Sequence, residues 1–148
     1  MRALGLDLGT KTIGLAVSDE LGITAQGLPT LERRSPRKDL EALAERATEF
    51  AIDRFVIGLP LNMDGSEGPR SEFTRKFGTQ LEEVTKLPVL YWDERLTTVA
   101  AQRALREVDA SRKKRKEVID QVAAVLILQG WLDAQRPQPS VYGDEPAD

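Results

Sequence analysis

The chain contains neither cysteine nor histidine among its 148 residues. It therefore cannot bind zinc through the usual nitrogen and sulfur ligands, and it lacks both a cysteine nucleophile and a histidine general base. Any catalysis must depend on carboxylates, hydroxyls, lysines or a metal ion bound by oxygen atoms, such as Mg²⁺ or Mn²⁺. The absence of cysteine also excludes disulfides, which favours a cytoplasmic location.

Long apolar runs are missing as well. The longest uninterrupted run covers residues 122–128 and is too short to cross a bilayer. Asp7 and Lys11 interrupt the N-terminal segment before the apolar part of a signal peptide could form, so we expect no membrane partner. The length and the 41% hydrophobic composition fit one globular domain, which we place at residues 1–136. Residues 137–148 have no hydrophobic pattern, which predicts a disordered tail.

Charge of neither sign dominates, since the formal net charge is only −3. An acidic chain argues weakly against a nucleic-acid partner, because such domains are usually basic. Two basic clusters weaken that objection, "RRSPRK" at residues 33–38 and "SRKKRKE" at residues 111–117. The second could be an ordinary solvated loop. It could instead contact the phosphates of a nucleic acid through Arg112, Lys113, Lys114, Arg115 and Lys116.

Apolar segments and turn residues predict the order of the elements. Glycine-punctuated apolar segments at residues 2–8, 12–18 and 23–31 predict an antiparallel meander. Ser35 and Pro36 then have the residue types of a helix cap and of a first helical position. Two further strands are expected at residues 54–60 and 87–94, and the helices are expected to begin at Pro36 and to cover residues 69–84, 97–108 and 117–132, with the basic run between the last two.

This order predicts an α/β fold with a five-stranded mixed sheet flanked by helices. A helix between two strands makes a crossover, so the later strands are expected to run parallel to the first. If each new strand lies beside its predecessor, the sheet order is 3-2-1-4-5. The carboxyl ends of the first, fourth and fifth strands then share one edge of the sheet, where α/β folds place their sites.

Carboxylates converge on this edge. Asp7 lies near the end of the first strand, and Asp93 and Glu94 end the fifth strand. Crowded carboxylates repel one another unless a divalent cation bridges them, and this composition permits a cation with oxygen ligands. Asp120 is expected on the buried face of the last helix, because its same-face neighbours are all apolar: Ala123, Ala124, Ile127, Leu128 and Trp131.

Each acid also has a simpler interpretation. Asp7 could cap the following turn through a hydrogen bond, and Asp120 could be favoured by the helix dipole in a first helical turn. Asp93 and Glu94 could form a solvated strand end that pairs with Arg95. The convergence of the acids favours a functional site, whereas three further carboxylates are better explained as turn residues: Asp19, Asp64 and Glu67.

Four segments together resemble the YqgF (RuvX) family of ribonuclease-H-like proteins. That family is described as Holliday-junction resolvases and as nucleases that mature the 5′ end of precursor 16S ribosomal RNA. The segments are "LGLDLGTKTIGLAVSD", "VIGLPLNMDGSEGPRS", "WDERLTT" and "IDQVAAVLILQGWL", in that order along the chain. The resemblance therefore covers nearly the whole domain and implies a ribonuclease-H-like fold.

The resemblance implies a hydrolase, a divalent-metal-dependent nuclease whose acidic site consists of Asp7, Glu94 and Asp120. It selects Glu94 over Asp93, which the strand pattern left open. It further implies phosphodiester hydrolysis with two Mg²⁺ or Mn²⁺ ions, which Asp7 would bridge. The substrate would be precursor ribosomal RNA or branched DNA, recognised by its shape, and the enzyme a monomer or a homodimer. Candidates to position phosphates are Lys11, Arg70 and Arg95.

Two alternative functions compete with the nuclease. The segment "DLGTKTIG" also resembles the phosphate loop of actin-like ATPases, but those proteins bind nucleotide between two such domains, and this chain has length for one. A non-catalytic ribosome-assembly or nucleic-acid-binding factor could keep the fold without the chemistry. The presence of all three acids favours the nuclease.

Overall fold

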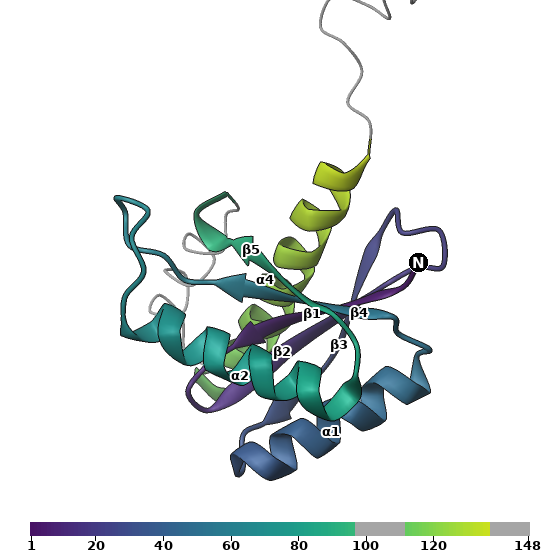
Figure 1. The fold of residues 1–148 in the computed structure, drawn as a ribbon, viewed down its shortest axis with the longest axis horizontal. Helices are drawn as coiled ribbons and strands as arrows, with labels where there is room; N and C mark the ends of the chain where they lie inside the picture. The colour runs from purple at the N-terminus through teal and green to yellow at the C-terminus, as the bar shows by residue number, and fades with distance from the viewer. Residues whose placement is uncertain (97–111, 137–148) are drawn as a thin grey trace, which may run out of the picture.

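The computed structural model describes residues 1–96 and 112–136. One five-stranded sheet lies at its centre, with the strand order β3-β2-β1-β4-β5 that the sequence predicts. The strands are β1 (Ala3–Leu8), β2 (Thr12–Ser18), β3 (Ala25–Glu32), β4 (Arg54–Leu59) and β5 (Val89–Asp93). The helices are α1 (Pro36–Glu49), α2 (Pro69–Thr85) and α4 (Arg112–Gln135). The first two lie side by side on one face of the sheet, and α4 packs on the other (Figure 1).

The strand directions place three carboxyl ends at one edge, as expected. β1 pairs with β2 and β2 with β3 in antiparallel fashion, which confirms the predicted meander. β4 is parallel to β1, and β5 is parallel to β4. The carboxyl edge is therefore formed by the ends of β1, β4 and β5, together with the turn that joins β1 to β2.

Local signals fix most element boundaries. The Ser35 side chain accepts a hydrogen bond from the Lys38 backbone N–H at 3.2 Å, and Pro36 opens α1, as predicted. β3 begins two residues later than expected. The backbone N–H of Ile23 instead donates to the Asp19 carboxylate at 2.7 Å, so this part of the chain completes a turn before the strand starts.

The two faces of the sheet differ in the size of their side chains. Along β1, leucines point toward α1 and α2 and join a core of large apolar residues. Ala3, Gly5 and Asp7 occupy the alternate positions and face α4. A Cβ atom on Gly5 would lie only 2.7 Å from Cβ of Leu128, so α4 packs almost directly on the sheet backbone.

The last helix begins earlier than the sequence analysis predicts. We expected a helix over residues 117–132 with the basic run before it, whereas α4 begins at Arg112 and contains residues 112–116. Lysine and arginine have high helix propensity, and no glycine or proline interrupts the segment, so the helix extends through the run. The interpretation of this run as a loop is wrong.

Two expectations fall outside the described residues: the helix at residues 97–108 and the disordered tail at residues 137–148. None of the helices that the structure does describe is long and apolar enough to span a membrane.

The close packing of α4 on β1 makes a stability prediction. Gly5→Ala should lower the free energy of unfolding by about 1–3 kcal/mol, because the added Cβ overpacks a buried contact with Leu128. Urea titration followed by circular dichroism measures this change. The matched substitution Gly68→Ala, whose Cβ would meet no atom closer than 3.5 Å, should cost clearly less. Equal losses in the two variants would show that Gly5 is not a packing constraint.

Candidate active site at the carboxyl edge

The candidate site is built around Asp7. This residue is only 2% exposed, and it lies on the α4 face near the end of β1. Glycine occupies the sheet positions on both sides of it. Gly14 of β2 pairs directly with Asp7, and Gly58 of β4 follows the pair that Leu6 makes with Ile57. Because these glycines have no side chain, other parts of the protein can approach the sheet closely on either side of Asp7.

Asp120 approaches Asp7 over the first of these glycines. A Cβ atom on Gly14 would overlap the backbone oxygen of Asp120 and would lie 3.4 Å from Cβ of Asp7. Asp120 is 4% exposed, and its carboxylate accepts a hydrogen bond from the Thr12 hydroxyl on β2. It therefore lies on the buried face of α4, as predicted. The helix-dipole interpretation is wrong, because eight residues of α4 precede Asp120.

Glu94 approaches over the second glycine. It begins a short 3₁₀ turn, η1 (Glu94–Leu96), directly after β5. A Cβ atom on Gly58 would lie 2.8 Å from Oε1 of Glu94 and would also overlap the Ile127 side chain of α4. The Glu94 carboxylate thus turns onto the α4 face of the sheet. The structure brings Asp7, Glu94 and Asp120 to one face and one edge.

These three acids share one region of the sheet, but their side chains are not arranged as the ligands of a metal ion. Within residues 1–96 and 112–136, no three acidic side chains are grouped as metal ligands. Asp7, Glu94 and Asp120 each make interactions with other parts of the protein. The chain therefore determines the face and edge that the three carboxylates share, and a bound cation would require their side chains to adjust.

Asp93 is occupied by a different partner. Its carboxylate accepts hydrogen bonds from the Arg95 side chain at 2.8–3.2 Å and from the Arg95 backbone N–H at 2.9 Å. These bonds hold the pKa of Asp93 below its ordinary value, the side-chain bond having the larger effect. The alternative interpretation, in which the strand end pairs with Arg95, is thus correct for Asp93.

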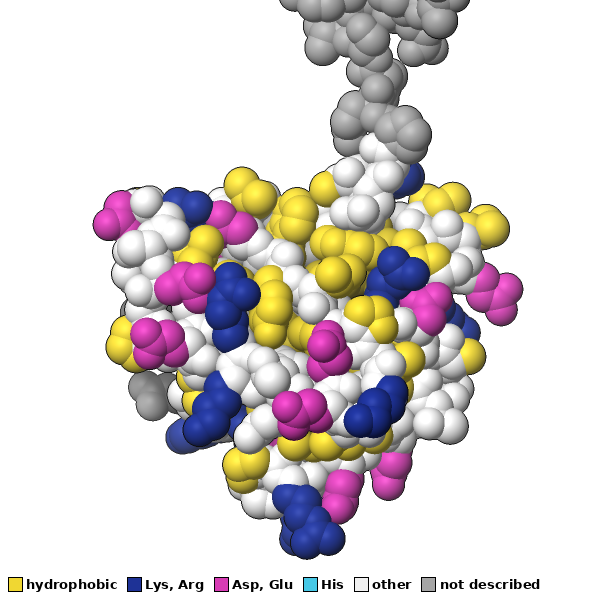
Figure 2. Space-filling view, viewed as in Figure 1, with side chains coloured by type: hydrophobic (Ala, Val, Ile, Leu, Met, Phe, Trp, Pro, Cys, Tyr) yellow, Lys and Arg dark blue, Asp and Glu magenta, His cyan; other side chains and the backbone are white. Residues whose placement is uncertain are grey.

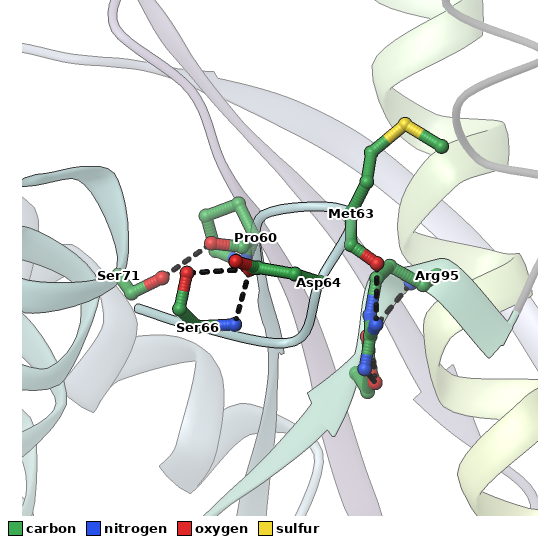
Figure 3. A network of polar contacts seen from close by, with 7 residues as sticks. Pro60, Met63, Asp64, Ser66, Ser71 and Arg95 are labelled. Atoms are coloured by element: carbon green, nitrogen blue, oxygen red, sulfur yellow. Dashed lines mark hydrogen bonds and ion pairs between the residues drawn. The ribbon is translucent and has the colours of Figure 1, made fainter. Parts of the chain in front are cut away.

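Arg95 also ties the strand end to the loop that leaves β4. Its guanidinium donates to the Met63 carbonyl at 3.2 Å (Figure 3). It also packs against Gly65, whose φ of +88° suits glycine. In the same loop, the Asp64 carboxylate accepts bonds from the Ser66 backbone and hydroxyl, which confirms that Asp64 is a turn residue. The Arg95 side chain, which the sequence analysis predicts to contact phosphate, already binds Asp93 and the Met63 carbonyl.

The other predicted basic contacts lie elsewhere. Lys11 and Arg70 line a hollow on the α1 and α2 side of the sheet, opposite the face that carries Asp7. Figure 2 shows this side of the molecule, where Lys and Arg side chains alternate with Asp and Glu. The basic run at residues 112–116 forms the first turns of α4, the helix that carries Asp120.

Sequence reasoning missed three residues that shape the site: Thr12, Gly14 and Gly58. The two glycines carry a signal, because a glycine inside an apolar strand pattern often marks a close approach of another backbone or side chain. Thr12 carries none, since its partner Asp120 is 108 residues away in the sequence.

The fold resembles solved structures of Holliday-junction resolvases. "T. thermophilus RuvC in complex with Holliday junction substrate" aligns with a TM-score of 0.58 and 14% identity, covering 90% of this chain and 96% of that one. "Crystal structure of Fowlpox virus resolvase and substrate Holliday junction DNA complex" aligns with a TM-score of 0.54 and 11% identity, covering 90% and 98%. At such identities the likeness shows the shared fold, the predicted ribonuclease-H-like one.

Sequence comparison gives the family. A protein of Myxococcus xanthus named "Putative pre-16S rRNA nuclease" is 60% identical over 99% of this chain and 100% of its own length. A protein of the same name from Heliobacterium modesticaldum is 56% identical over 91% of each chain. The model of the RuvX family, described as Holliday junction resolvase, matches residues 1–134. The chain therefore belongs to the RuvX family.

Proposed function

We propose that this protein is a divalent-metal-dependent nuclease that hydrolyses phosphodiester bonds in structured nucleic acid. The observation that carries the proposal is the approach of Asp120 and Glu94 to Asp7 over two glycines, Gly14 and Gly58. Two of these carboxylates are almost fully buried. A buried carboxylate is stabilised by hydrogen bonds, by ion pairs or by a bound cation, and one cation at this edge could interact with all three acids, which supports a metal-binding role.

The residues present fit the ion. Asp7, Glu94 and Asp120 supply only carboxylate oxygen, which suits Mg²⁺ or Mn²⁺, and the absence of a Cβ atom at Gly14 and Gly58 lets Asp120 and Glu94 lie close to the sheet on the face of Asp7. We assign all three residues as ligands, with Asp7 between the other two. When bound, a pair of such ions would lower the pKa of the attacking water and stabilise the leaving oxygen.

The surrounding residues hold the ligands in place. The Thr12 hydroxyl fixes the orientation of the Asp120 carboxylate by donating to it. Arg95 joins the strand end next to Glu94 to the β4 loop through Asp93 and Met63, so we assign Arg95 as a positioning residue for Glu94. Lys11, Arg70 and the run at residues 112–116 are assigned to the phosphates of the substrate.

The relatives guide the choice of substrate. Proteins named as pre-16S rRNA nucleases are 53–60% identical over at least 90% of this chain, whereas the resolvase structures are at most 14% identical. We therefore propose the 5′ end of precursor 16S ribosomal RNA as the first substrate to test and a four-way DNA junction as the second. Because ribosomal RNA is processed where ribosomes are assembled, we also propose a cytoplasmic location for the activity.

The carboxylates give the central prediction. Asp7→Asn, Glu94→Gln and Asp120→Asn should each abolish Mg²⁺-dependent cleavage of a leader-bearing ribosomal RNA fragment and of a four-way junction. Each change removes one charge from a crowded group, so the metal-free variants should melt at the same temperature as the wild type or higher. Asp64→Asn, at an exposed turn, is the control and should cleave normally. Full cleavage by Asp7→Asn would contradict the mechanism, and a wild type without cleavage would favour the assembly-factor alternative.

The assignment of Arg95 gives a second prediction. Arg95→Gln should raise the pKa of Asp93 toward its ordinary value, because the main hydrogen bond that lowers it is lost. A group with a lowered pKa stabilises the fold above its unfolded pKa and loses that effect as pH falls through its folded pKa. The stability difference from the wild type should therefore appear above about pH 4 and vanish in stronger acid. Carboxyl NMR titration and urea titrations measure both effects, and an unmoved Asp93 pKa would refute the bond between Arg95 and Asp93 on which the assignment depends.

The basic run gives a third prediction. Changing Lys113, Lys114 and Arg115 to Gln should flatten the salt dependence of log affinity by roughly one to three units and weaken DNA and RNA substrates alike. Salt titrations in Ca²⁺, intended to hold the substrate without cleavage, measure the slope. The control removes equal charge away from the carboxyl edge, at Arg54, Lys76 and Lys86. Equal slopes in the two triple variants would exclude the run from the interface.

A further inference from the structure

A hollow of about 800 Å³ opens at the carboxyl edge, on the side of β1 opposite the acids. Leu8 lines it, whereas Asp7, the preceding residue, faces α4, because successive residues of a strand point to opposite faces. Its walls are the turn between β1 and β2, the end of β3 and the first turns of α1 and α2. Both helices begin on the side where the β1–β2 hairpin turns (Figure 1). The candidate active site and the hollow therefore share the end of β1 as a common wall.

The lining of the hollow is positively charged although the chain is acidic overall. Four basic side chains line it, against the two carboxylates of Glu32 and Asp39. Arg33 and Asp39 form a shielded ion pair at 3.2 Å, with their side chains 13% and 4% exposed. The three remaining basic residues of the lining have exposed side chains: Lys11, Arg34 and Arg70. Besides Asp39, the lining holds one acid, Glu32. Such a cluster suits a phosphate group.

An aromatic ring stands beside these cations. Phe73 of α2 lines the hollow and is 50% exposed, which is unusual for a large apolar side chain. The Arg33 guanidinium lies 5.4 Å from the centre of its ring and is held there by Asp39 and by the Gly9 carbonyl at 2.9 Å. Arg33 therefore lies against the ring, and half of the Phe73 residue remains exposed to solvent. An exposed ring next to phosphate-binding cations is the arrangement on which single-stranded bases stack.

The N-terminus of α2 adds to the positive character of the hollow. Pro69 opens this helix after Gly68, and no side chain caps its first turn, unlike α1, which Ser35 caps. The uncapped end presents backbone N–H groups and the positive end of the helix dipole. Pro69 and Arg70 both line the hollow, so this end faces the same space as the cations.

We propose that the hollow binds one unpaired nucleotide of the substrate strand. Its base stacks on Phe73, and its phosphate lies among Lys11, Arg34 and Arg70. The volume is that of a small-molecule site, so it accommodates a nucleotide but not a duplex. The assignment rests on the proposed action on nucleic acid and makes it more specific: the preferred substrate has an unpaired segment next to the bond that is cut.

A fluorescent variant tests occupancy directly. In Phe73→Trp the new indole should be quenched by a DNA duplex with a three-nucleotide single-stranded extension, measured in Ca²⁺, and much less by the same duplex with blunt ends. The matched control is Val84→Trp, which places an indole at an exposed position near the other end of α2 and should not respond. Quenching of both indoles alike, or of neither, would overturn the proposal.

Affinity ratios test the contribution of the ring and the cations. Phe73→Ala should lower the preference for extended over blunt duplex at least about fivefold, and Phe73→Trp should retain it, because stacking needs an aromatic face. Arg34→Gln should flatten the salt slope for the extended duplex by about 0.7, against no change in Lys76→Gln, which lies outside the hollow. An unchanged preference in Phe73→Ala would overturn the assignment.

Two further comparisons complete the test. One distinguishes a nucleotide of the substrate strand from a free nucleotide, and the other distinguishes failure of this proposal from failure of the proposed nuclease activity. Adenosine monophosphate alone, at the same nucleotide concentration, should quench Phe73→Trp far less than the extended duplex. Equal quenching would assign the hollow to free nucleotides and overturn the substrate assignment. The binding measurements need no cleavage. If the protein cuts no substrate but shows extension-dependent quenching, nucleotide binding in the hollow is supported and the proposed nuclease activity is refuted. If it cleaves substrate without quenching, the nuclease activity is supported and nucleotide binding in the hollow is refuted.

Discussion

The close approach of α4 to the sheet is the constraint on which the rest of this structure depends. A helix can lie this near a sheet only where the side chains between them are small, and the α4 face supplies glycine at Gly5, Gly14 and Gly58. At Gly14 the helix backbone itself fills the space of the missing side chain. An ordinary helix-to-sheet distance would leave Asp120 a side chain's length away from Asp7. The glycines are therefore as much a part of the candidate site as the acids.

The same constraint gives the two faces of the sheet different roles. The large apolar residues of the sheet, with the leucines of β1 among them, pack against α1 and α2 and form the larger core. The α4 face holds mostly small residues together with the long apolar side of α4 itself. Because stability can be supplied largely by the first face, the second can tolerate buried carboxylates at its edge. The cost of burying Asp7 and Asp120 is then offset by packing elsewhere in the domain.

The sequence predicted what local patterns determine. Alternating and continuous apolar runs located the strands, and the apolar stripe of the last helix placed Asp120 on its buried face. The strand pattern could not separate Asp93 from Glu94, since adjacent residues at a strand end differ only in the direction they point. The family resemblance chose Glu94, and the structure shows Asp93 engaged by Arg95. The start of α4 and the contact between Thr12 and Asp120 were not predictable in this way, because the first depends on weak propensities and the second on tertiary packing.

The positions of the charged residues explain how a chain with a negative net charge can bind a polyanionic substrate. Fields in physiological salt are screened over about 8 Å, so a phosphate responds to the few groups around it rather than to the net charge of −3. On one side of β1, Asp7 and Asp120 are buried and Glu94 is partly exposed, and a bound cation would offset the repulsion between these carboxylates and a phosphate. On the other side, Lys11, Arg34 and Arg70 outnumber the acid that faces them. A strand crossing the end of β1 would therefore meet favourable charge on both sides, provided that the metal is bound. Substrate affinity and metal occupancy should consequently be coupled, each increasing the other by the same factor.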